Sequence, residues 1–246
     1  MVKLTADIIL QSMQFINAYK DRELDLRGYK IPVIENLGAT LDQFDIIDFS
    51  DNDIRKLDGF PLLKRLNSLL FNGNRIVRIG ENLEDFLPNL EMLILTNNHI
   101  QELADIDPLA TLPKLTHLSL LHNPVTMKPH YREYVIFKIP QLRVLDFRKV
   151  KQKEREAALA KFQSKQGKEL QKNIQKTRTF VPGEELPTIA PAKVMPASEV
   201  KAIKEAIAKA SSLEEIERLN QMLRAGQVPG KVESKVQQNG QEEMET

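Results

Sequence analysis

The sequence predicts an α/β solenoid in which short parallel strands stack side by side into a curved sheet. The first observation is a recurring apolar pattern, L-x-x-L-x-L-x-x-N-x-L, whose asparagines lie 22, 24 and 25 positions apart. Such a period is typical of solenoids built from strand-and-return units. The second is that a helical pattern precedes the repeats and a helix-and-strand pattern follows them. Both are expected because terminal repeats must cover an open core.

A helix at the N-terminus is expected to cover the open end of the first repeat. Thr5 can cap this helix, and apolar residues at helical spacing continue to Tyr19. We therefore assign residues 1–21 to an N-terminal capping helix. A helix that binds a partner is the alternative interpretation.

Five leucine-rich repeats are predicted over residues 22–127, with a degenerate copy at the start. In the clearest copy, Leu93 and Leu95 point into the core, whereas Met92 and Ile94 point outward. Four copies end their strand at an asparagine, whose amide can bond the free backbone groups of adjacent coils and so form a ladder. The ladder residues are Asn52, Asn74, Asn98 and Asn123.

Four further segments are expected after the repeats and before the tail. Helix-forming residues and a last partial copy predict a C-terminal cap, and a lysine-rich stretch predicts a basic helix. Four prolines mark a linker, and a capping box at Ser212 opens the second helix of a hairpin. The assigned ranges are the C-terminal cap 128–155, the basic helical segment 156–178, the linker 179–197, the helical hairpin 198–229 and the disordered tail 230–246.

The composition limits the class of protein. Apolar residues make up 41% of the chain and charged residues 28%, which is ordinary for a soluble domain. The absence of cysteine excludes disulfides and fits a reducing compartment. We see no signal peptide and no apolar run of roughly 20 residues that could span a bilayer. The sequence therefore predicts an intracellular protein that makes no membrane contact.

The net charge of +1 conceals a strongly basic block. Residues 148–178 hold 11 Lys and Arg against 3 Asp and Glu, whereas residues 1–147 hold 16 against 20. Such a block favours contact with nucleic-acid phosphates, and without interleaved aromatic residues that contact would not depend on base sequence. A solvated helix face and a nuclear-import signal are alternative interpretations. The residues expected to contact RNA phosphate are Arg148, Lys149, Lys151, Lys153 and Arg155.

The outward strand positions form what we call the concave face of the predicted sheet. Its centre is apolar and its ends are charged, which is typical of a protein interface. A curved sheet fits a convex partner such as a helix, and the aspartates could pair with its Lys or Arg. Coverage by the protein's own tail is the alternative. The expected partner-binding residues are Asp25, Ile46, Asp48, Leu70, Met92, Ile94, His117, Leu121 and Asp146.

No motif in the sequence predicts catalysis, a cofactor or a metal site. Gly167 and Lys168 lack the upstream glycine of a phosphate-binding loop, and the four histidines lack metal-ligand spacing. No nucleophile motif is recognisable. We therefore predict a non-enzymatic protein without a cofactor.

Several segments resemble one known family of leucine-rich repeat proteins, the A-prime proteins of the U2 small nuclear ribonucleoprotein. The resemblance covers essentially the whole chain and is densest over residues 20–155. The segments that carry it are residues 24–32 (LDLRGYKIP), 49–52 (FSDN), 57–61 (LDGFP) and 143–147 (RVLDF).

The resemblance implies a nuclear, non-catalytic scaffold of the spliceosome. The concave face would bind a helix of an RNA-recognition-motif partner, the B-double-prime protein, and the pair would bind a stem-loop of U2 RNA. Lys149, Lys151 and Lys153 would lie toward the RNA stem, and the hairpin would dock on other spliceosomal proteins. A leucine-rich regulatory subunit of a nuclear phosphatase is the alternative. The acidic leucine-rich nuclear proteins are disfavoured, because the tail holds too few acidic residues.

Overall fold

The computed structural model describes residues 2–177 and residue 179. The chain divides into two units, Met1–Glu184 and Glu185–Thr246. The predicted hairpin (198–229), the tail (230–246) and all of the linker after Thr179 therefore lie outside the described residues.

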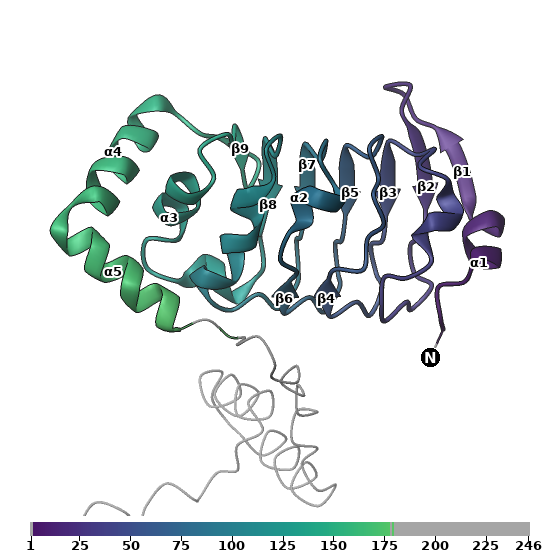
Figure 1. Cartoon of the computed structure of the whole chain (residues 1–246), viewed down its shortest axis with the longest axis horizontal. Helices are drawn as coiled ribbons and strands as arrows, with labels where there is room; N and C mark the ends of the chain where they lie inside the picture. The colour runs from purple at the N-terminus through teal and green to yellow at the C-terminus, as the bar shows by residue number, and fades with distance from the viewer. Residues whose placement is uncertain (1, 178, 180–246) are drawn as a thin grey trace, which may run out of the picture. The chain divides into compact units, whose positions relative to one another are not determined.

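Six short strands pair in parallel to form the spine of this unit (Figure 1). Their register aligns Leu24, Ile47 and Leu69 with their counterparts in later repeats, and these inward residues are fully buried. The parallel sheet confirms the predicted α/β leucine-rich repeat fold. The strands are β2 (Arg22–Asp25), β3 (Ile46–Asp48), β5 (Ser68–Leu70), β7 (Met92–Ile94), β8 (His117–Ser119) and β9 (Val144–Leu145).

Return segments on the opposite side complete each coil. Their apolar side chains fill the space behind the sheet, where the rings of Phe49 and Phe71 stack with centroids 5.1 Å apart. A second, two-stranded parallel sheet joins two of these returns. The return elements are η1 (Leu37–Thr40), β4 (Lys56–Leu57), β6 (Arg78–Ile79), α2 (Leu83–Phe86), η2 (Leu103–Thr111) and η3 (Pro124–Met127).

Buried asparagines connect neighbouring coils. Asn98 Oδ1 accepts a hydrogen bond from the Ile76 N–H at 2.9 Å, and its Nδ2 donates to the Phe71 carbonyl at 2.8 Å. Asn52, Asn74 and Asn123 make equivalent bonds to the coil before them. Each amide thus satisfies backbone groups that would otherwise be buried without a partner.

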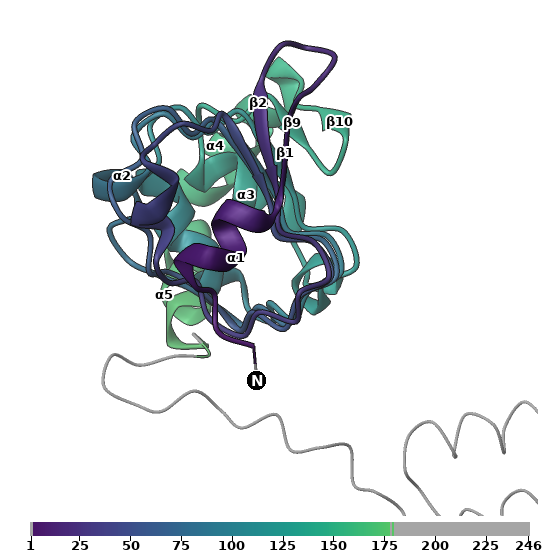
Figure 2. The same ribbon diagram turned by 90° about the vertical axis from the view of Figure 1, so that its right-hand side faces the viewer.

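The N-terminal helix is much shorter than predicted. Helix α1 (Ala6–Gln11) is capped by Thr5, whose side chain accepts a hydrogen bond from the Ile8 N–H. It lies within the outline of the coils when the array is viewed from its N-terminal end (Figure 2), with Ile9 buried. The following residues form strand β1 (Met13–Ile16), antiparallel to β2. A strand forms here because β2 would otherwise leave its edge N–H and C=O groups unpaired.

Three helices close the C-terminal end. Helix α3 (Tyr131–Lys138) packs on the last repeat, and α4 (Gln152–Gln163) packs on α3. The fully buried Phe162 ring contacts Tyr134 edge-on at 5.6 Å and stacks on Phe137 at 5.0 Å between centroids. Between these helices, β10 (Arg148–Lys149) pairs antiparallel with β9. The boundary predicted at residues 155/156 therefore falls inside α4, whose second half belongs to the core.

The basic segment forms two helices rather than one. Ser164 ends α4 and caps α5 (Lys165–Lys176), because its Oγ accepts a hydrogen bond from the Gly167 N–H at 3.0 Å. Gly167 sits at the corner, where a β-carbon would overlap the Lys161 carbonyl and lie 2.7 Å from the Phe162 Cα. Only a residue without a side chain lets the two helices approach this closely.

Candidate partner-binding face and basic surface

The strand register sets the side-chain rows of the concave face. One row runs through Ile46, Ser68, Met92, His117 and Val144, and the next through Asp48, Leu70, Ile94 and Ser119. Most of the large side chains in these rows are half-buried, and Ile94 is only 9% exposed. Neighbouring side chains therefore support one another, and the apolar surface exists before any partner arrives. A surface that is already ordered loses little conformational entropy on binding.

Two residues that sequence analysis placed in a helix extend this face by one strand. Met13 lies opposite Asp25, and Phe15 lies opposite Glu23. Directly opposed residues in an antiparallel pair point to the same side of the sheet. Met13 is 66% exposed and Phe15 is 36% exposed, so both are available to a partner. The alternation of Met13, Gln14 and Phe15 was the available signal for a strand.

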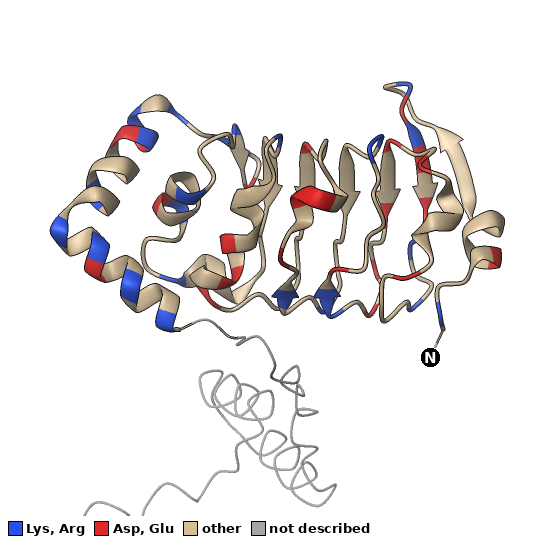
Figure 3. Cartoon of the chain, viewed as in Figure 1, with Lys and Arg blue, Asp and Glu red and all other residues tan. Residues whose placement is uncertain are grey.

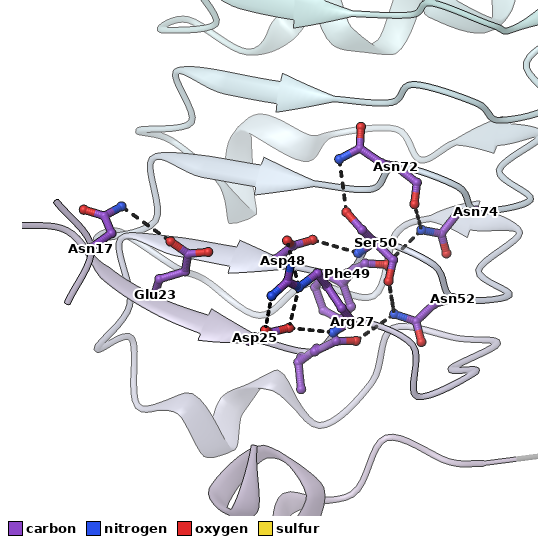
Figure 4. A network of polar contacts seen from close by, with 11 residues as sticks. Asn17, Glu23, Asp25, Arg27, Asp48, Phe49, Ser50, Asn52, Asn72 and Asn74 are labelled. Carbon is purple, nitrogen blue, oxygen red and sulfur yellow. Dashed lines mark hydrogen bonds and ion pairs between the residues drawn. The ribbon is translucent and has the colours of Figure 1, made fainter. Parts of the chain in front are cut away.

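The two aspartates at the N-terminal end of the face share one arginine of the same chain. The Arg27 guanidinium donates to both Asp25 oxygens at 3.0 and 2.6 Å, and its Nε lies 3.5 Å from Asp48 Oδ2 (Figure 4). The hydrogen bonds from Arg27 hold the pKa of Asp25 below its usual value. Asp48 also accepts the Ser50 N–H at 2.8 Å. The two carboxylates and the one guanidinium together keep a net charge of −1, so the binding of a partner's cation here stays a prediction.

Asp146, predicted as a partner-binding acid, lies in a turn instead. It follows β9 in a left-handed conformation, and its carboxylate accepts hydrogen bonds from the Leu120 N–H at 2.8 Å and the Tyr131 hydroxyl at 2.9 Å. Burial raises the pKa of Tyr131, and the neighbouring Asp146 carboxylate raises it further. Asp146 ties the cap to the last repeat. Each carboxylate oxygen already accepts one hydrogen bond within the chain, and a contact of Asp146 with a partner stays a prediction.

The basic residues after the sheet fall into two groups. Arg148, Lys149, Lys151 and Lys153 are exposed. The Arg155 guanidinium instead donates to the Pro140 carbonyl at 2.5 Å and to the Leu142 carbonyl. Arg155 thereby supplies hydrogen-bond donors to two carbonyls of the segment that leads into β9, and its contact with phosphate stays a prediction.

The two candidate surfaces meet at the last strand. Lys149 pairs with Val144, so it ends the row that begins at Phe15. The basic side chains are thus continuous with the C-terminal edge of the concave face. Leu121 lies two residues beyond the end of β8 and is half-buried.

Comparison with known proteins shows the family to which this chain belongs. A leucine-rich repeat family profile matches residues 1–175. The U2 small nuclear ribonucleoprotein A′ of Mus musculus is 61% identical over 247 residues, which span 100% of this chain and 97% of that protein. The chain belongs to the U2 small nuclear ribonucleoprotein A′ family.

Other members agree with this assignment. The A′ protein of Homo sapiens is also 61% identical, with the same coverage of both chains. Among solved structures, one chain of a crystal structure of the Drosophila melanogaster SNF/U2A′ complex matches with a TM-score of 0.69 and 63% identity. The match covers 71% of this chain and 100% of that chain.

Two features are absent from the described residues of this A′-family chain. Within residues 2–177 and 179 there is no cluster of three or more His, Cys, Asp or Glu that could hold a metal ion. Nor does the described part contain a helix long and apolar enough to cross a membrane.

Proposed function

We propose that this chain is a non-catalytic scaffold of the U2 small nuclear ribonucleoprotein and acts in the nucleus in pre-mRNA splicing. In this role, its concave face binds a helix of an RNA-recognition-motif protein, of the B-double-prime type. The observation that best supports this proposal is the row of side chains that runs across the sheet from Phe15 through Met92 to Lys149. It joins a preformed apolar surface directly to exposed cations.

The apolar centre supports a partner of helical shape. Leu70, Met92 and Ile94 lie on the two central strands, and Met13 and Phe15 add apolar area beyond the first repeat. An amphipathic helix laid on such a surface buries its apolar side against these residues. Asp25, Asp48 and Arg27 form a charged group with a net charge of −1 at one end of the face, and a Lys or Arg of the partner helix could pair with it. The solved relative is a complex of U2A′ with SNF, which supports a protein partner.

The exposed cations support an additional contact with RNA held by that partner. Arg148, Lys149, Lys151 and Lys153 would contact phosphates of a U2 RNA stem, without reading base sequence. The chain therefore binds RNA mainly through its partner. Docking of other spliceosomal proteins on residues 198–229, and the division of the chain beyond the repeats, remain predictions.

The experiment replaces two half-buried face residues with a charged one, Leu70→Glu together with Met92→Glu. We expect affinity for the purified RNA-recognition-motif partner to fall about 30-fold or more, because each carboxylate would be desolvated in the interface. Isothermal titration calorimetry measures the affinity. The matched control is Leu62→Glu, which alters a 51% exposed leucine on a return segment.

Circular dichroism of each variant confirms that the array is folded. Unchanged affinity in a folded double variant would rule out the concave face as the binding surface. A pull-down from nuclear extract distinguishes the splicing scaffold from the phosphatase regulatory subunit. Recovery of a phosphatase catalytic subunit without U2 RNA would favour the regulatory-subunit alternative instead.

A further inference from the structure

Helix α5 presents two chemically opposite sides. Gly167, Leu170 and Ile174 recur at intervals of three and four residues and face the rest of the unit, with Gly167 and Ile174 buried. Lys165, Lys168, Lys172 and Lys176 recur with the same spacing and are all exposed. At 100° per residue these lysines occupy the side of the helix opposite to the buried one. We call them the α5 lysine stripe; Figure 3 shows blue bands recurring along α5.

The stripe has no anionic partner in the described part of the chain. No hydrogen bond or ion pair of the four ammonium groups occurs among residues 2–177 and 179. Other lysines near the cap are engaged: Lys161 pairs with Glu133 at 2.5 Å, and Lys138 lies 3.4 Å from Asp107. Glu169 is the single acidic residue of α5. The repeat unit therefore neutralises its neighbouring lysines and leaves this row charged.

The stripe is held in place rather than carried on a loose helix. At its start, Ser164 caps α5, and Gln171 Nε2 donates to the Phe162 carbonyl at 2.8 Å. Beyond its end, the Thr179 N–H and hydroxyl donate to the carboxylate of Asp105 at 3.0 and 2.6 Å. Asp105 is 6% exposed and belongs to η2 of the repeat array. Both ends of α5 are thus fixed to the folded unit.

We propose that the α5 lysine stripe binds the phosphate backbone of double-stranded RNA. This surface is additional to the exposed residues of the cap, and it rests on the proposed function only for the identity of the polyanion. Lysines are flexible point charges that suit phosphate contacts without base readout. Lys165 and Lys176 are separated by about 16 Å along the helix axis. A duplex presents phosphates about every 3.4 Å along each strand, so several lie within reach of the stripe.

The composition of the helix favours a duplex over a single strand. Single-stranded nucleic acids are usually held by aromatic side chains on which bases stack. Helix α5 contains no aromatic residue. Duplex RNA is recognised through its shape and phosphates, which requires no stacking platform.

The test replaces all four lysines by glutamine in the full-length chain, written Lys165→Gln, Lys168→Gln, Lys172→Gln and Lys176→Gln. Glutamine keeps helix propensity while it removes charge. Fluorescence anisotropy with a blunt RNA duplex of about 20 base pairs should show affinity weaker by about tenfold or more at 50 mM salt. The slope of log affinity against log salt should become shallower by up to about 3.6, since each of the four lost phosphate contacts removes roughly 0.9.

The matched control carries the same loss of charge on four exposed lysines elsewhere, namely Lys3→Gln, Lys20→Gln, Lys64→Gln and Lys114→Gln. It should retain duplex affinity. An unchanged affinity and slope in the stripe variant would overturn the proposal, as would an equal loss in both variants, which would reflect net charge alone. Loss of binding to an acidic peptide with duplex binding intact would assign the stripe to a protein partner instead.

The two proposals fail in distinguishable ways. The stripe variant should keep its affinity for the RNA-recognition-motif partner measured without RNA. The Leu70→Glu and Met92→Glu variant should keep its affinity for the bare duplex.

Discussion

Phe147 shows how far one residue can be held from its preferred backbone conformation. It and Asp146 form the two-residue turn between β9 and β10, with φ values of +59° and +53°. Turns of this kind usually carry glycine at such a position, because a β-carbon meets the following carbonyl. The Phe147 side chain is 69% exposed and gains little from packing. Its strain must be balanced by the surrounding contacts, chiefly those of Asp146.

Phe147→Gly is therefore expected to stabilise the protein. Relief of the left-handed conformation, which costs about 1–2 kcal/mol, should exceed the added entropy of the unfolded chain and raise the free energy of unfolding by about 0.5 kcal/mol. Urea denaturation followed by circular dichroism measures the change. Phe86→Gly, in the exposed but helical context of α2, should lower stability instead. A less stable Phe147→Gly variant would mean that the ring contributes contacts of its own.

A second residue-scale feature is the pair that fastens α4 to α3. Arg132 donates to both Glu154 oxygens at 2.7 and 3.2 Å, which lowers the pKa of Glu154 from 4.5 to about 2. A carboxyl whose pKa is lower in the folded state stabilises the fold above its unfolded pKa. That stabilisation is present above about pH 5 and is lost as the pH falls toward 2.

Glu154→Gln should accordingly lower the free energy of unfolding by about 1 kcal/mol at pH 7, a value reduced because water reaches the pair. The difference from the parent protein should shrink between pH 5 and pH 3. Urea titrations at several pH values give both numbers. Glu156→Gln on the same helix, where the exposed carboxylate accepts a hydrogen bond from the neutral Gln152 amide, should be nearly neutral. A deficit in Glu154→Gln that persists unchanged at pH 3 would refute the electrostatic origin.

Among the secondary-structure elements, the sequence predicted the strands of the repeats but not the strand at the N-terminal end. The strand positions follow from a fixed spacing of apolar residues, so the register could be read directly from the sequence. Residues 13–16 fit both a helical stripe and a strand alternation. The helix stops where the Ser12 Oγ donates to the Ile8 carbonyl at 2.6 Å, and the unpaired edge of β2 then determines the outcome. That edge is a tertiary feature which no local window contains.

The corner between α4 and α5 has no room for a methyl group at Gly167. Gly167→Ala should destabilise the corner by about 2 kcal/mol, because the added carbon would overlap Lys161 and Phe162 backbone atoms. Hydrogen exchange of α5 amides should accelerate more than exchange in the repeats. Gln166→Ala, one residue earlier and exposed, is the control. Slower exchange in Gly167→Ala would indicate that helix propensity outweighs the clash.

Across the first unit as a whole, apolar and cationic surfaces follow one another along the chain. The central rows of the concave face are largely apolar, and exposed cations are concentrated from Arg148 to Lys176. The sequence predicted this order because it depends only on which residues point outward. It did not predict that Arg27 occupies Asp25 or that Arg155 bonds to carbonyls. Those contacts depend on where long side chains reach, and sequence spacing does not specify that.

The antiparallel strands at the two ends of the sheet also affect whether further coils could be added to the array. A stack of parallel coils resembles an open polymer, since each end could in principle accept the opposite end of another copy. Here β1 and β10 run antiparallel to their neighbours, and α1 and α3 cover the exposed core. The apolar interior of the first unit is therefore not left open for a second copy to continue the stack of parallel coils.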